Sequence, residues 1–183
     1  RLAVRDLFLL TMKPVIYVAN IGEHEIQGDS DHVAAIEEWA LSKRYNAPVV
    51  AISAKLESEL AELDSEDAAE FLKELGMQSS ALDRIILASY NALDLLTFYT
   101  TKGDETRAWT VRQGTAAPQA AGVIHSDMQQ GFIKAEVIDY ESLIRVGSLA
   151  GARDKGLVRQ EGRDYLIKDG DVILFRFSEP PKK

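Results

Sequence analysis

Two short apolar runs rich in β-branched residues, 14–19 and 48–52, constrain the fold of this chain more than any other feature. Runs of this length and composition are typical of strands buried on both faces of a parallel sheet. Apolar residues recur at helical spacing over 31–45, after candidate N-cap residues at 29–31. A strand, a crossover helix and a second strand form a βαβ unit, so the sequence predicts two parallel strands.

Polar residues follow each predicted strand directly. The carboxyl ends of neighbouring parallel strands meet at one edge of a sheet, and ligands of open α/β sheets bind outside that edge. We therefore expect one ligand site formed by Asn20, Ile21 and Glu23 after the first strand and Ser53, Ala54 and Lys55 after the second.

These two segments resemble a pair of motifs, Asn-Lys-x-Asp and Ser-Ala-Lys, with which many nucleotide-binding proteins hold a purine base. Here the first motif reads Asn-Ile-Gly-Glu. Guanine presents two neighbouring donors that a short Asp carboxylate accepts together, whereas adenine has a ring acceptor in place of one of them. Glu23 in place of Asp and Ile21 in place of Lys therefore favour adenine over guanine.

The resemblance extends along nearly the whole chain and identifies it with the YchF family of Obg-like ATPases. Further matching segments are residues 9–14, 52–55, 107–110, 114–125, 161–165 and 169–172. The resemblance implies a cytoplasmic, ribosome-associated P-loop protein that prefers ATP to GTP. It also implies that Asn20 binds the base, that the backbone at Ile21 lies against the amino edge of the base, and that Glu23 orients the loop.

The expected fold class is α/β for the C-terminal part of a P-loop G domain, followed by an α+β TGS domain of the β-grasp type. The resemblance implies a helical insertion that ends at residues 1–12, the base-recognition half of the G domain over 13–72, a helical linker over 73–93, the TGS domain over 94–178 and a flexible tail over 179–183.

The phosphate-binding motif Gly-x-x-x-x-Gly-Lys-Ser/Thr does not occur in this sequence. Its nearest approach, residues 151–156, is followed by Leu157 and Val158 instead of Lys and Ser or Thr. Because the chain opens on Arg1 within an apolar helical pattern, we expect a fragment of a longer protein, whose missing front half carries the phosphate loop, the catalytic residues and Mg²⁺. Alone, the fragment is expected to bind ATP weakly and not to hydrolyse it.

The net charge of −8 lies wholly in the first half of the chain. Residues 1–90 hold 8 Lys and Arg against 16 Asp and Glu, whereas residues 91–183 hold 13 of each. Phosphate contacts depend on Lys and Arg, so the second half is the better candidate for binding RNA, while DNA and membrane partners are not expected. Its candidate partner-binding residues are Arg107, Arg112, Lys134, Arg153, Lys155, Arg159 and Arg163, although an ordinary solvated surface explains them equally well.

Patterns in the second half predict two hairpins, one joining 96–101 to 106–112 and one joining 165–167 to 172–177, with a helix over 118–130 and a strand over 133–138. Three amphipathic helices, over 56–63, 65–75 and 80–93, precede them, and the third opens with a capping-box pattern, Ser80-x-x-Asp83. Two functions fit these features. The first is an ATP-hydrolysing enzyme; the alternative is an RNA- or ribosome-binding TGS module whose nucleotide site acts only as a switch.

Overall fold

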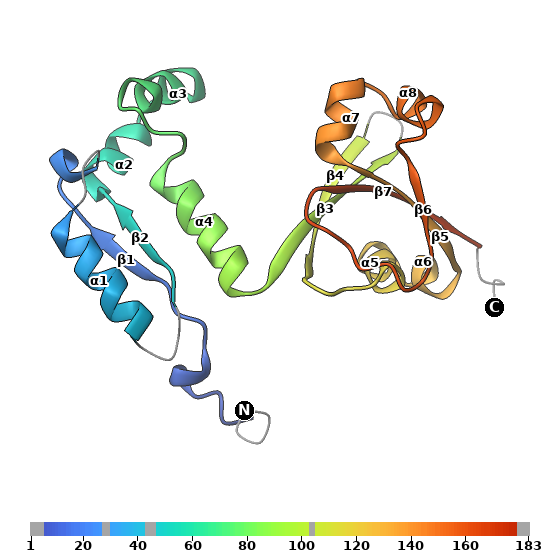
Figure 1. Cartoon of the computed structure of the whole chain (residues 1–183), viewed down its shortest axis with the longest axis horizontal. Helices are drawn as coiled ribbons and strands as arrows, with labels where there is room; N and C mark the ends of the chain where they lie inside the picture. Colours follow the sequence, from blue (N-terminus) through green and yellow to red (C-terminus); the bar gives the residue numbers. More distant parts are fainter. Residues whose placement is uncertain (1–5, 27–29, 43–46, 103–104, 179–183) are drawn as a thin grey trace. The chain divides into compact units, whose positions relative to one another are not determined.

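The computed structural model describes residues 6–26, 30–42, 47–102 and 105–178. The chain divides into two compact units, residues 1–93 and 94–183, which we call unit 1 and unit 2 (Figure 1). The fold class is the expected one, with parallel α/β structure in unit 1 and a β-grasp-like α+β arrangement in unit 2. Among the described residues, no helix combines the length and apolar composition needed to cross a membrane.

Unit 1 contains the predicted βαβ arrangement. Strands β1 (Tyr17–Asn20) and β2 (Val49–Ile52) pair in parallel, with Asn20 opposite Ile52 at their carboxyl ends. Helix α1 (Asp31–Ser42) lies between them in the sequence. Its predicted continuation over 43–45 and the N-cap candidate Asp29 lie outside the described residues.

Three helices complete unit 1: α2 (Ala54–Leu60), α3 (Ser65–Glu74) and α4 (Ala81–Ala92). The predicted capping box of α4 is present, since Ser80 Oγ accepts from the N–H of Asp83 and the Asp83 carboxylate accepts from the N–H of Ser80. Glu57 on α2 accepts from the N–H groups of Ala81 at 2.7 Å and Leu82 at 3.3 Å. This side chain therefore ties α2 to the start of α4.

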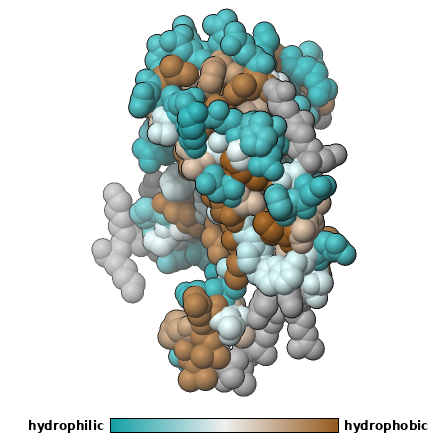
Figure 2. Space-filling view, turned by 90° about the vertical axis from the view of Figure 1, so that its left-hand side faces the viewer, coloured by the Kyte–Doolittle hydropathy of each residue, from teal (hydrophilic) through white to brown (hydrophobic). Residues whose placement is uncertain are grey.

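The segment before β1 differs from its prediction. The helical residues within 6–12 are 3-10 residues, at 6–7 and in η2 (Leu10–Met12), and none of them is α-helical. Residues 1–5 lie outside the described part. The apolar side chains of this segment are exposed, Phe8 at 82%, and form the brown group at the lower end of Figure 2.

Unit 2 is built on a five-stranded sheet in the order β4-β3-β7-β5-β6. Its strands are β3 (Leu95–Lys102), β4 (Glu105–Arg112), β5 (Phe132–Asp139), β6 (Arg159–Glu161) and β7 (Asp171–Phe177). The predicted first hairpin is confirmed by the pairing of Lys102 with Glu105, while its turn residues 103–104 lie outside the described part. Strand β7 is central, parallel to β3 and antiparallel to β5.

Helices lie on both faces of this sheet (Figure 1). On one face, α5 (Ala117–Ile124) and α6 (Ser126–Gln130) cover the main core, where Ala117, Ala120 and Ala121 are fully buried. On the other face, α7 (Tyr140–Val146) and α8 (Leu149–Asp154) cover a smaller cluster around Ile138 and Val172. The small side chains of α5 let its backbone approach the sheet closely.

The predicted single helix over 118–130 is wrong, because the chain breaks at His125. That residue has extended backbone angles, φ −161° and ψ 140°, and its Nδ1 accepts from the N–H of Asp127 at 3.2 Å. His125 thus caps α6 at the point where α5 ends.

The predicted hairpin between 165–167 and 172–177 is also wrong. Residues 168–171 do form a turn, with Gly170 at φ +77°, a conformation that glycine adopts without strain. Leu166, however, forms only an isolated bridge with Ala116, and β7 pairs with β3 and β5 instead. Strand β7, which follows the turn, therefore pairs with strands that are distant in the sequence.

Candidate nucleotide-binding site

Asn20 joins the two polar segments at the carboxyl edge of β1 and β2. Its Oδ1 accepts a hydrogen bond of 3.1 Å from the N–H of Ala54, the first residue of α2. Since a backbone N–H only donates, the Asn20 amide must turn its oxygen to Ala54 and its NH₂ group away. The side chain therefore presents two donors at the sheet edge, which fit a ring-nitrogen acceptor.

Ile21 presents its carbonyl group in the same region. Its N–H donates to the carbonyl oxygen of Ile52 at 2.8 Å, which extends the β1–β2 ladder by one bond. Within the described part of the chain, no group donates to the Ile21 carbonyl oxygen. The backbone here therefore offers an acceptor and not a donor.

Ser53 acts as the N-cap of α2 and is 4% exposed. Its Oγ accepts from the N–H of Leu56 at 3.5 Å, and its carbonyl oxygen accepts from the N–H of Glu57. The Ala54 N–H donates to Asn20, so it is not free to bind a base. Ser53 is buried under the site, whereas the Lys55 side chain extends into solvent.

Lys55 forms an ion pair with Glu23 across the two segments. Its Nζ lies 2.9 Å from Glu23 Oε1 and 3.7 Å from Glu59 Oε1. The hydrogen bond to Glu23 is the main reason that the pKa of Lys55 is raised above its usual value. The Lys55 side chain is 72% exposed, so this pair positions the two side chains and adds little to stability.

Glu25 is a site residue that the sequence reasoning missed. Its carboxylate accepts from the N–H of Gly22 at 3.0 Å and from the Ser30 hydroxyl at 2.9 Å. The backbone hydrogen bond from Gly22 is the main reason that the pKa of Glu25 is lowered. Glu25 holds the 3-10 turn η3 (Glu23–Glu25), so the loop is ordered by Glu25 together with the Glu23–Lys55 pair. A Glu three residues after Gly22 was the available signal.

The candidate partner-binding residues of unit 2 do not form one surface. Arg107 bonds Glu105 on β4, Arg112 lies at the exposed end of the same strand, and Arg163 donates to the Phe132 carbonyl oxygen at 3.1 Å. Lys155 is the exposed C-cap residue of α8. Lys134 and Arg153 are the exceptions, because both lie near Glu136 on one face of the sheet.

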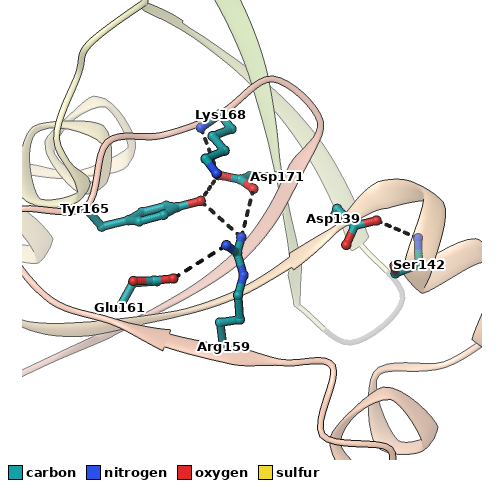
Figure 3. A network of polar contacts seen from close by, with 7 residues as sticks. All are labelled: Asp139, Ser142, Arg159, Glu161, Tyr165, Lys168 and Asp171. Atoms are coloured by element: carbon teal, nitrogen blue, oxygen red, sulfur yellow. Dashed lines mark hydrogen bonds and ion pairs between the residues drawn. The ribbon is translucent and has the colours of Figure 1, made fainter.

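Arg159 belongs to a polar network, although its side chain is 44% exposed (Figure 3). Its Nη2 lies 3.2 Å from Tyr165 Oη and 3.7 Å from Asp171 Oδ1, while Tyr165 Oη donates to Asp171 Oδ2 at 2.8 Å. Asp171 is only 2% exposed and also accepts from the N–H of Lys168 at 2.9 Å. This network joins β6, the 168–171 turn and β7, so a structural role accounts for Arg159.

The network predicts a loss of stability at alkaline pH. Burial, followed by the hydrogen bond to Asp171, raises the pKa of Tyr165 from 10.0 to about 12. Because the folded state holds this proton more tightly than the unfolded chain, its contribution is complete below pH 10 and is lost as the pH rises toward 12. Between pH 10 and 12, the melting temperature of the wild type should therefore fall more steeply with pH than that of Tyr165→Phe. Parallel curves for the two proteins would contradict this assignment.

Comparison with known proteins supports the class that the fold defines, a parallel α/β unit joined to a β-grasp-like unit. Residues 95–178 match the family model YchF-GTPase_C, whose description is protein of unknown function. The chain is 50% identical over 177 residues to the ribosome-binding ATPase YchF of Bacillus subtilis, covering 96% of this chain and 48% of that protein. It is 44% identical over 182 residues to human Obg-like ATPase 1, covering 98% and 46%.

A solved structure gives the same result. The chain resembles the Schizosaccharomyces pombe YchF GTPase with a TM-score of 0.80 and 34% identity, covering 94% of this chain and 46% of that one. The match to the YchF family of Obg-like ATPases covers nearly the whole chain, which spans about half the length of the relatives it matches. The relatives are named ATPase in two cases and GTPase in one, so their names leave the preferred base open.

Proposed function

We propose that this chain is the base-recognising and TGS-containing part of a ribosome-associated, cytoplasmic ATPase that prefers ATP to GTP. The observation that carries the proposal is the hydrogen bond between Asn20 Oδ1 and the Ala54 N–H. It brings the two base-binding motifs together and turns the Asn20 NH₂ group toward a bound base. Purines of both kinds carry the ring acceptor N7, so Asn20 holds either base without choosing between them.

The choice of base falls to the next residue. Adenine carries an amino group beside N7, whereas guanine carries a carbonyl oxygen there. The Ile21 carbonyl oxygen can accept from the adenine amino group, but it repels the guanine carbonyl oxygen because both are acceptors. The Ile21 N–H is bound to Ile52, so it cannot donate to the guanine carbonyl instead. Glu23 is engaged by Lys55, so it is not available to accept the donors of guanine.

Phosphate and metal chemistry belong to a part of the protein that this chain does not supply. ATP hydrolysis requires Mg²⁺ and a phosphate loop, and the motif for that loop is not in these 183 residues. Within the described ranges, no three His, Asp or Glu side chains lie together as a metal site. The chain therefore contributes recognition of the base, and hydrolysis of ATP requires the intact protein.

A second candidate is an RNA- or ribosome-binding module in which nucleotide binding only switches the arrangement of the units. The names of the relatives favour it, because several are called ribosome-binding. The two candidates are compatible in one protein. The switch requires that ATP binds two arrangements of the protein unequally.

Titration of the intact protein with ATP and with GTP at fixed Mg²⁺ concentration tests the base preference. ATP should bind more tightly. The double variant Ile21→Lys, Glu23→Asp should shift the preference toward GTP by about 1–3 kcal/mol, because it restores the pair of groups that read guanine. Equal or tighter binding of GTP by the wild type would sink the proposal.

The matched control makes the same two changes on the exposed surface of α1. Leu41→Lys with Glu38→Asp alters charge and size in the same way and should leave both affinities unchanged, since Leu41 is 70% exposed and lies in the last turn of α1. The isolated chain serves as the negative control for phosphate release. Steady ATP hydrolysis by residues 1–183 alone would contradict the division of labour proposed here.

A further inference from the structure

One face of the unit 2 sheet is only partly covered. Along β5, Ala135 and Val137 point into the main core, so Lys134 and Glu136 point to the opposite face. Helices α7 and α8 cover the end of that face around Ile138. Toward the other end of β5, polar side chains from β5, β6, β7 and α8 come together.

Glu136 organises this group. Its Oε2 lies 3.0 Å from Arg153 Nη2 on α8, and its Oε1 lies 2.8 Å from Arg176 Nε on β7. The Glu136 side chain is 13% exposed, whereas those of Arg153 and Arg176 are 46% and 48% exposed. Each guanidinium has five N–H donors, so each keeps donors for an outside ligand while Glu136 fixes its position.

Lys134 adds a third cation beside them. It lies directly opposite Arg176 in the β5–β7 pairing, and its Nζ donates to Gln160 Oε1 at 3.0 Å. A hollow of about 350 Å³ lies between these side chains, lined by Glu136, Arg153, Val158, Gln160 and Arg176. The basic cluster, Lys134, Arg153 and Arg176, thus sets three cations against one carboxylate in a half-chain with equal numbers of basic and acidic residues.

The chemistry of the hollow separates two kinds of partner. Protein interfaces are anchored by buried aromatic and large apolar side chains, but Val158 is the single apolar residue among the five that line this hollow. Phosphate groups, by contrast, match guanidinium forks with two parallel hydrogen bonds. Arginines already fixed by Glu136 lose less freedom when they bind, which favours a phosphate ligand further.

We propose that the basic cluster is a docking surface for the phosphate backbone of RNA. This inference rests on the proposed ribosome association, which supplies the RNA, and it is independent of nucleotide binding. No aromatic side chain lines the hollow, so recognition depends on the backbone and not on base sequence. Arg107 and Arg163 are not part of the surface, and Arg176, which the sequence reasoning did not select, is.

Fluorescence anisotropy of the whole chain with a labelled single-stranded RNA of about 20 nucleotides tests the proposal, at roughly 50 and 200 mM salt. The triple variant Lys134→Gln, Arg153→Gln, Arg176→Gln should bind at least about tenfold more weakly at low salt. The slope of log affinity against log salt should fall by about 2, because three phosphate contacts to a single strand are removed. Unchanged affinity and slope would overturn the proposal.

Two controls keep the test decisive. Lys73→Gln, Arg107→Gln, Lys168→Gln removes the same charge elsewhere, and an equal loss in this variant would also overturn the proposal. Because the first triple variant leaves Glu136 without partners, Gln160→Glu adds a carboxylate to the hollow while every cation stays, and it should weaken RNA binding several-fold. If the intact triple variant co-sediments with ribosomes as the wild type does, the surface assignment fails and the proposed ATPase function stands.

Discussion

The Asp171→Ala variant is expected to lose about 3–5 kcal/mol of the folding free energy of unit 2, the range for breaking a buried charged network by removing one partner. Asp171 is 2% exposed and accepts hydrogen bonds from Tyr165 Oη and from the N–H of Lys168. Truncation leaves both donors without their acceptor and leaves Arg159 without its nearest buried carboxylate. Thermal unfolding followed by circular dichroism should show a midpoint lower by roughly 10 °C or more.

A neighbouring acid provides the matched control. Asp169 lies in the same turn but is exposed, and its one described contact is the N–H of Thr97 at 2.7 Å. Asp169→Ala should therefore cost only about 0.5–1.5 kcal/mol, as for a single hydrogen bond near the surface. A similar loss in both variants would mean that the turn, and not the buried network, determines the effect.

Local sequence signals predicted the elements whose partners are close in the chain. The βαβ unit, the first hairpin of unit 2 and the capping box at Ser80 depend on contacts within a few residues or on one crossover helix, and all three are confirmed. The apolar runs also placed Asn20 and Ala54 at one edge of the sheet. Their hydrogen bond follows from the parallel register, which pairs Asn20 with Ile52.

Distant partners account for the wrong hairpin and for the mixed roles of the basic residues. The Asp-Gly turn at 169–170 is a strong hairpin signal, but its groups bond to Thr97 on β3, far away in the sequence. Strand β7 therefore lies in the middle of the sheet, and the residues close to it in the sequence do not indicate which strands it pairs with. Likewise, the basic residues of unit 2 look alike in sequence, and only the fold separates Arg159, held by Asp171, from Arg176, held by Glu136.

Phe98→Ala should be among the most destabilising single substitutions in unit 2. Phe98 is fully buried and meets the Phe175 ring edge-on, with centroids 6.0 Å apart. Phe175 in turn contacts Phe132, so one aromatic row joins β3, β7 and β5 beneath α5. Removing a buried Phe costs about 3–5 kcal/mol, because the lost transfer free energy is added to the cost of the cavity.

The expected result is a fall in the unfolding midpoint of roughly 10 °C or more, measured on the same unit by circular dichroism. Ile133→Ala on β5 is the control, since Ile133 is 59% exposed and its truncation should cost well under about 1 kcal/mol. The same row also supports the strands that carry Glu136 and Arg176. Phe98→Ala should therefore weaken RNA binding only at temperatures where unit 2 unfolds, which separates a loss of the fold from a loss of the basic cluster.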